Sequence, residues 1–297
     1  MSKTNAAKGI AVLMLMIVEI AAIPLWLRAL IYSVAFPLLF VICGLEKRNR
    51  RDEGLSLVVY LLICVFAIVY CTEIKPGPDW REVFVGITPL WLIPVCCLLR
   101  LLNAGFDAWE QKSLSVVNCV VAAVISAFGF ALGYKGIYLP LGADILCVAV
   151  FFLYFGRVLL GRKDFFIKMR YLLVPAAFLC WCVLVYSGRW MEMPIRAYRG
   201  HVLSFVAGCA GCVVLLWFGK LVEKCRGVHA FLSWFGEKSV ILLGVTGFAQ
   251  LYIDWMDIYA FVPTTWEEDA LFRIFVLSFV AYCLDVAGEK LARLNRI

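Results

Sequence analysis

Residues 8–22 read KGIAVLMLMIVEIAA, and residues 28–47 read RALIYSVAFPLLFVICGLEK. Each is an apolar run close to the roughly 20 residues that an α-helix needs to cross the hydrocarbon core of a bilayer. The first run carries one carboxylate, Glu19, and the second carries a proline, Pro37. Because the two runs follow one another closely, they predict a pair of membrane-spanning helices.

The rest of the chain continues this pattern. Of its 297 residues, 64% are hydrophobic and 16% are charged, whereas about a quarter of the residues in a soluble domain are charged. We therefore expect an all-α, polytopic membrane helix bundle that forms a single domain over residues 1–297. Ten transmembrane helices are predicted, over 8–23, 28–45, 55–72, 83–102, 114–132, 138–156, 170–187, 201–220, 237–253 and 269–287.

Basic residues cluster in alternate connections between the predicted helices. They gather after the second, sixth and eighth helices and in the C-terminal tail, whereas the connection after the ninth helix has none. Since short cytoplasmic loops carry an excess of Lys and Arg, we expect both termini in the cytoplasm and a multi-pass chain in the inner or plasma membrane. The formal net charge of +7 follows from this topology and does not indicate a nucleic-acid partner.

The chain has thirteen cysteines and two histidines. Most of the cysteines lie in apolar runs, where a free thiol often behaves as a small hydrophobic side chain. Cys209 and Cys212 have the spacing of a redox or metal motif, but no second pair or histidine lies near them in the sequence, which favours helix packing. His201 and His229 are too far apart for an ordinary metal site, so no metal is predicted.

The carboxylate of Glu19 falls near the middle of the first predicted span. A charged group at that depth costs at least about 2.5–3.5 kcal/mol unless it faces a bundle interior or a wet cavity. Lys8 precedes Glu19 by eleven residues, so the two lie on one helix face, about 16 Å apart. Glu19 is therefore either a functional group or a protonated side chain that packs helices together.

The two opening runs resemble the start of the acyltransferase 3 family, integral membrane O-acyltransferases that modify cell-surface carbohydrates. That family has a basic residue, ten further residues and a histidine in its first helix, and Lys8 matches the basic position. Later stretches are similar more loosely, and the resemblance extends over nearly the whole chain. The matching residues of the second helix are Tyr32, Ser33, Pro37, Leu38, Phe40 and Gly44, and the later ones include Leu90, Trp91, Leu92, Pro94, Asp144, Phe151, Phe152, Gly156, Gly236 and Ser239.

This resemblance implies transfer of an acyl group, usually acetyl from acetyl-CoA, to a glycan or glycolipid hydroxyl. The three histidines expected of the family are Glu19, Ala35 and Thr246 here. Glu19 is then the candidate catalytic base, because a buried carboxyl group can be tuned for proton transfer. Lys8 is expected to hold the donor's phosphates or to anchor the helix.

Five other residues are candidates for the site. Asp144 is either a catalytic carboxylate that orients a sugar hydroxyl or the partner of an arginine. Arg100 either binds cofactor phosphates through its planar guanidinium or anchors its helix at the membrane boundary. Substrate contacts are expected from Tyr32, Trp91 and His201, although a lone interfacial histidine such as His201 is more often structural.

Two functions are therefore expected. The first is a membrane-embedded O-acyltransferase with acetyl-CoA as its donor and with the lipid bilayer and a glycan or glycolipid acceptor as its partners. The alternative is a catalytically inactive relative that acts as a transporter or as a partner subunit in surface-polysaccharide assembly. The missing histidines favour the alternative, whereas the spacing of Lys8 and Glu19 favours the enzyme.

Overall fold

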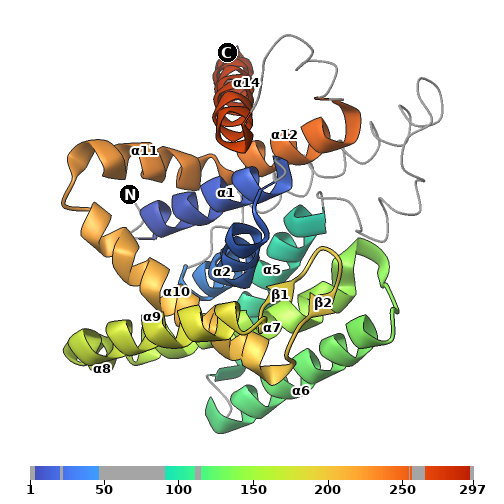
Figure 1. Ribbon diagram of the computed structural model, residues 1–297, viewed down its shortest axis with the longest axis vertical. Helices are drawn as coiled ribbons and strands as arrows, with labels where there is room; N and C mark the ends of the chain where they lie inside the picture. The colour runs from blue at the N-terminus through green and yellow to red at the C-terminus, as the bar shows by residue number, and fades with distance from the viewer. Residues whose placement is uncertain are drawn as a thin grey trace.

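The structure is a computed structural model that describes residues 4–20, 23–46, 91–110, 115–253, 255 and 265–294. This part of the chain is nearly all-α, as the sequence predicts, and Figure 1 shows its arrangement. Its α-helices are α1 (Asn5–Ile20), α2 (Leu25–Leu45), α5 (Leu92–Glu110), α6 (Ser115–Tyr134), α7 (Ala143–Gly161), α8 (Lys163–Lys168), α9 (Arg170–Tyr186), α10 (Val202–Val222), α11 (Arg226–Glu237), α12 (Ser239–Tyr252) and α14 (Trp266–Leu294).

Five of the described helices, α2, α6, α7, α10 and α14, are long and apolar enough to cross a membrane. Helices α11 and α12 meet at a bend of 68° and add a sixth candidate span if the pair is counted as one. Helices α1, α5 and α9 are apolar but shorter. Five or six of the expected spans are thus helices of suitable length and apolar composition, and the expected span at 55–72 lies outside the described residues.

Helix α2 forms the centre of the bundle and contacts α1, α5, α7, α9 and α10. In the most apolar stretch of α2, 72% of the residues are buried, against 22% in the corresponding stretches of α6 and α14. Since every one of these helices is strongly apolar, this difference separates a helix enclosed by protein from helices with a broad outward-facing apolar surface. Such a surface suits contact with lipid. The helix continues through Pro37 without interruption.

Glycines allow α2 and α7 to approach closely. A Cβ atom at Gly44 would lie 2.2 Å from the carbonyl oxygen of Leu153, and one at Gly156 would lie 2.2 Å from the carbonyl oxygen of Val41. No real Cβ atom tolerates such a contact with backbone. Small residues that bring two backbones together are typical of helix pairs in membranes, and here they fix the position of the central helix.

Helix α11 was not expected, because residues 226–237 fall in a predicted loop. It lies alongside α1 (Figure 1), and the pair again meets at glycines. A Cβ at Gly9 would lie 1.8 Å from the carbonyl oxygen of Leu232, and one at Gly236 would lie 2.1 Å from that of Asn5. The loop prediction was wrong for this stretch because α11 is short and carries Arg226, His229 and Glu237, so it lacks an apolar run of membrane-spanning length.

A short hairpin covers one end of the bundle. Strand β1 (Met191–Glu192) pairs antiparallel with β2 (Ala197–Tyr198), and a 3-10 turn, η2 (Pro140–Gly142), precedes α7 nearby. Glu192 forms an ion pair with Arg28 in the first turn of α2. We call this region the hairpin end, and the region around Glu46, where α2 stops, the pocket end. Eighteen residues of α2 separate Arg28 from Glu46, which is about 27 Å along the helix.

Candidate functional site

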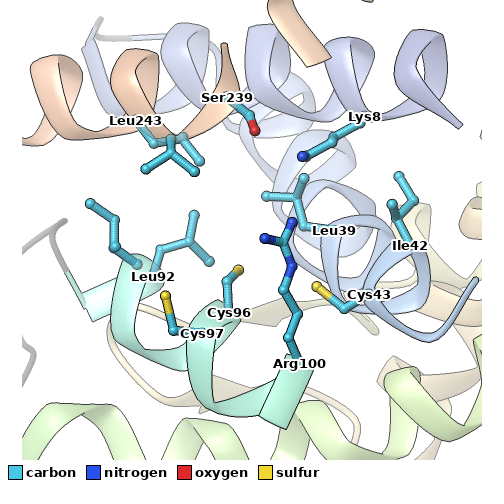
Figure 2. Close-up of a pocket in the computed structure, with 12 residues that line it drawn as sticks. Lys8, Leu39, Ile42, Cys43, Leu92, Cys96, Cys97, Arg100, Ser239 and Leu243 are labelled. Atoms are coloured by element: carbon cyan, nitrogen blue, oxygen red, sulfur yellow. The ribbon is translucent and has the colours of Figure 1, made fainter. Parts of the chain in front are cut away.

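A pocket of about 490 Å³ of empty volume, part of it open to solvent, lies at the pocket end. Figure 2 shows Lys8 of α1 and Arg100 of α5 extending into the same space from opposite sides. The remaining wall comes from α2 and from the start of α12. The lining residues are Lys8, Leu39, Ile42, Cys43, Leu92, Ile93, Cys96, Cys97, Arg100, Ser239, Val240 and Leu243.

The charges of this pocket are unbalanced. A guanidinium nitrogen of Arg100 lies 3.8 Å from a carboxylate oxygen of Glu46, whose other oxygen accepts a hydrogen bond of 2.9 Å from the Thr4 hydroxyl. Lys8 has no ion-pair partner within the described part of the chain. Two cations therefore face one carboxylate, and the excess positive charge favours an anionic ligand.

Asn103 holds the two main walls together. Its side-chain amide donates to the carbonyl oxygen of Cys43 at 2.9 Å, which is one of the last carbonyls of α2 and has no partner within the helix. Arg157 of α7 donates to the side-chain oxygen of Asn103 at 2.5 Å. These bonds fix α5 against α2 and α7, and so set the direction from which Arg100 enters the pocket.

Two thiols also meet in the pocket. Cys43 of α2 and Cys96 of α5 line the same pocket as Arg100. Figure 2 shows both sulfur atoms beside this arginine. Nothing in the sequence marks Cys43 or Cys96 as a site residue, because a cysteine in an apolar run normally packs as a small hydrophobic side chain. The cations at Lys8 and Arg100 were noticed, but their proximity to the thiols depends on tertiary structure.

A second, smaller pocket of about 310 Å³ adjoins the first. It shares the lining residues Leu92 and Leu243 with the larger pocket. Its other lining residues are Leu15, Phe36, Trp91, Thr246 and Gly247. Because Lys8 and Leu15 are seven residues apart on α1, they lie on the same helix face, and the two pockets follow that face towards Glu19.

The predicted site residues separate into two groups. The structure brings Lys8 and Arg100 together in the larger pocket and places Trp91 in the smaller one. Tyr32 is buried one turn from Phe36, with their ring centroids 5.9 Å apart, and lines neither pocket. Glu19 belongs to the last turn of α1, but its side chain lies outside the described part of the structure.

Asp144 lies at the hairpin end, away from both pockets. Its carboxylate is completely buried and pairs with Arg196, with Oδ2 at 2.8 Å from Nε. The other oxygen, Oδ1, accepts a hydrogen bond of 3.2 Å from the backbone amide of Leu139. Of the two roles predicted for Asp144, pairing with an arginine is the one that this geometry provides. Its role as a catalytic residue stays a prediction.

His201 is also at the hairpin end and precedes α10. Its exposed ring packs edge-on against Phe130 and Tyr134, with centroid distances of 5.7 and 6.3 Å. This aromatic cluster opens to the outside of the bundle and lies away from the pockets. His201 as a substrate contact therefore stays a prediction. In the described residues no group of three His, Cys, Asp or Glu side chains is arranged to hold a metal ion.

The fold and the pocket together describe a helical membrane protein with a cationic, thiol-lined pocket at one end of the bundle. The chain matches no family model, no curated protein and no solved structure.

Proposed function

We propose that this protein is a membrane-embedded O-acyltransferase that takes an acyl group, most simply acetyl, from acetyl-CoA and transfers it to a carbohydrate or glycolipid hydroxyl. One observation carries the proposal: Lys8 and Arg100, from helices far apart in the sequence, line one pocket. Phosphate binding is one of the two roles that the sequence predicts for each of these cations, the other being a helix anchor. The ligand proposed for them is the pyrophosphate and ribose phosphate of coenzyme A.

The shape of the pockets supports an extended donor. Arginine holds phosphate through a planar fork of N–H groups, and the ammonium of Lys8 adds a point charge. From there the smaller, mainly apolar pocket reaches Leu15, which is one turn of α1 before Glu19. The eleven residues from Lys8 to Glu19 span about 16 Å of helix. The proposed donor lies with its phosphates at Lys8 and its thioester directed towards Glu19.

In this arrangement Glu19 acts as the general base. It accepts the proton of the acceptor hydroxyl while the oxygen attacks the thioester carbonyl, and the carbon–sulfur bond then breaks. The coenzyme A thiolate leaves with the electron pair and takes up a proton. A base of this kind typically contributes a factor of 10²–10⁴ in rate. Replacement of Glu19 by Gln should therefore remove most of the transfer.

The proposed topology places the pocket end in the cytoplasm, where acetyl-CoA is made. Helix α1 leaves this end, whereas α2, α7 and α10 run towards it. Lys220 and Lys224 lie at the same end, at the finish of α10. This agrees with the bias of basic residues towards cytoplasmic connections and with ten helices whose termini are both cytoplasmic.

One observation favours the alternative, an inactive relative that transports a small molecule or assists polysaccharide assembly. The Thr246 hydroxyl, at a position where the family has a histidine, donates a 2.8 Å hydrogen bond to the carbonyl oxygen of Leu242. Ala35, at another such position, is fully buried and has no polar side chain. Neither residue supplies a base, so Glu19 carries the chemical part of the proposal alone.

The experiment that tests this function measures label transfer in membrane vesicles from cells that express the chain. Acetyl-CoA labelled in its acetyl group is added, and radioactivity is counted in the carbohydrate and glycolipid fractions. We expect transfer above that of vesicles without the protein, a loss of at least tenfold in Glu19→Gln, and full transfer in Lys224→Ala, the matched control at an exposed cation. Unchanged transfer in Glu19→Gln would remove the proposed base, and absence of transfer in every sample would favour the inactive relative.

A further inference from the structure

The thiols of the pocket differ from the other cysteines in what surrounds them. Cys43, near the end of α2, is 4% exposed, and Cys96 of α5 is partly exposed. Both line the larger pocket, one from each of two helices that pack against each other. The two thiols therefore share one partly open pocket at the boundary between α2 and α5.

Positive charge surrounds this pair. Arg100 lies beside both sulfur atoms, and Lys8 faces the same space (Figure 2). The thiolate, not the thiol, reacts with electrophiles and oxidants, and neighbouring Lys or Arg side chains favour the thiolate form. Cys209 and Cys212, by contrast, lie in the apolar middle of α10 among glycines and aromatic rings. The conditions for a reactive thiol are therefore present at the pocket.

We propose that Cys43 and Cys96 form an oxidisable dithiol site, and that a hydroperoxide such as hydrogen peroxide converts it to a disulfide between α2 and α5. The Cys43 thiolate attacks one peroxide oxygen, the oxygen–oxygen bond breaks, and the hydroxide that leaves takes up a proton to become water. This step gives the sulfenic acid of Cys43. The Cys96 sulfur then attacks the Cys43 sulfur, the sulfur–oxygen bond breaks, and a second water leaves. One peroxide is reduced by two electrons while two thiols are oxidised.

The direction of the reaction follows from the geometry. Figure 2 shows the Cys43 sulfur beside Arg100, and we assign to it the first reaction with the oxidant. Cys96 lines the same pocket and acts as the resolving thiol. Cys97 also lines the pocket, and Figure 2 shows its sulfur on the side of Cys96 that is away from Arg100 and Cys43. This provides an internal control, because two adjacent cysteines of one pocket differ in their position relative to Cys43.

The test uses the full-length chain in lipid nanodiscs, fully reduced and without any ligand. The protein is treated with hydrogen peroxide at neutral pH, blocked with N-ethylmaleimide, digested and examined by mass spectrometry without reduction. We expect a linked peptide pair that joins Cys43 to Cys96. It should form in Cys97→Ser as fast as in the wild type, disappear in Cys43→Ser and Cys96→Ser, and form several-fold more slowly in Arg100→Leu.

The wild-type result stands without any variant, so a variant that does not fold leaves the test intact. Recovery of Cys43 and Cys96 as maleimide adducts, after a dose that oxidises exposed thiols of the same chain such as Cys225, would overturn the proposal. A linked peptide through Cys97 in place of Cys96 would overturn it as well. The disulfide is measured without acetyl-CoA. The dithiol proposal can therefore fail while the proposed acyltransferase function stands, and the reverse is also possible.

Discussion

The two ends of α2 use arginine in different ways. At the hairpin end, Arg196 is enclosed with Asp144, and the side chains are 1% and 0% exposed. At the pocket end, Arg100 lies 3.8 Å from Glu46, both side chains remain partly exposed, and Lys8 adds a second cation. The first arrangement satisfies its charges internally and stabilises the fold. The second leaves positive charge directed into a cavity, as a binding site for an anion requires.

The largest effect is expected when the buried pair is broken. Arg196→Met leaves the carboxylate of Asp144 buried without its partner, and loss of one member of such a pair costs about 3–5 kcal/mol. We expect a marked fall in the thermal unfolding midpoint of the purified protein. Lys135→Met, at an exposed lysine of the same end, is the control and should leave the midpoint unchanged. A midpoint for Arg196→Met equal to that of the control would contradict the structural role of the pair.

The next largest effect concerns the close approach of α2 and α7. Gly156→Ala places a Cβ 2.2 Å from the carbonyl oxygen of Val41, and overpacking of this kind costs about 1–3 kcal/mol. Gly105→Ala in α5 is the matched control, since its Cβ meets nothing within 4 Å. There we expect a small gain, because alanine favours a helix over glycine. Equal thermal unfolding midpoints for the two variants would show that the helices are not held at this contact.

A smaller effect is expected at the pocket end. Arg100→Ala removes a partly exposed and loosely paired cation, and exposed pairs contribute about 0–1 kcal/mol. The unfolding midpoint should therefore move far less than in Arg196→Met. A comparable loss of stability in both variants would break the comparison between the two ends and would assign Arg100 a structural role.

The smallest effect depends on pH. Burial, followed by the negative charge of Asp144, raises the pKa of the Tyr198 hydroxyl in the hairpin. A raised folded-state pKa stabilises the fold below the unfolded value, near pH 10, and this contribution is lost as the pH rises above it. Unfolding midpoints should therefore fall more steeply above pH 10 in the wild type than in Tyr198→Phe. Identical slopes would show that this hydroxyl does not titrate differently in the folded state.

At neutral pH the same variant sharpens the prediction. The Tyr198 hydroxyl is buried and has no hydrogen-bond partner among the described residues. Removal of an unsatisfied buried hydroxyl is neutral or stabilising, so Tyr198→Phe should not lower the midpoint at pH 7. A clear loss at pH 7 would indicate a partner for the hydroxyl.

The length of the apolar runs was enough to predict the five or six described helices, or helix pairs, that are long and apolar enough to cross a membrane. Lys8 and Arg100 could be assigned to one end of the bundle from the sequence, because basic residues end apolar runs at the cytoplasmic boundary. Helix α11 could not be predicted in this way. It is short and carries Arg226, His229 and Glu237, and its packing partner α1 is more than 200 residues away in the sequence.

The sequence does not predict which side chains pair with one another. Asp144 and Arg196 are 52 residues apart, and nothing in their local patterns links them. Cys43 and Cys96 likewise come from two separate apolar runs, in which a thiol resembles any small side chain. Long-range contacts of this kind follow from the helix arrangement, so sequence reasoning found the cations of the pocket but not the thiols between them.

The most direct test of the account is a double-mutant cycle on acetyl-CoA binding, measured by calorimetry in nanodiscs with Lys8→Ala, Arg100→Ala and the combined variant. If both cations hold the phosphates of one donor, each single change should raise the Kd about tenfold, which is about 1.4 kcal/mol. The two effects should also be coupled by at least about 0.5 kcal/mol. Binding that is saturable but unchanged in both single variants would contradict the claim that this pocket holds the donor.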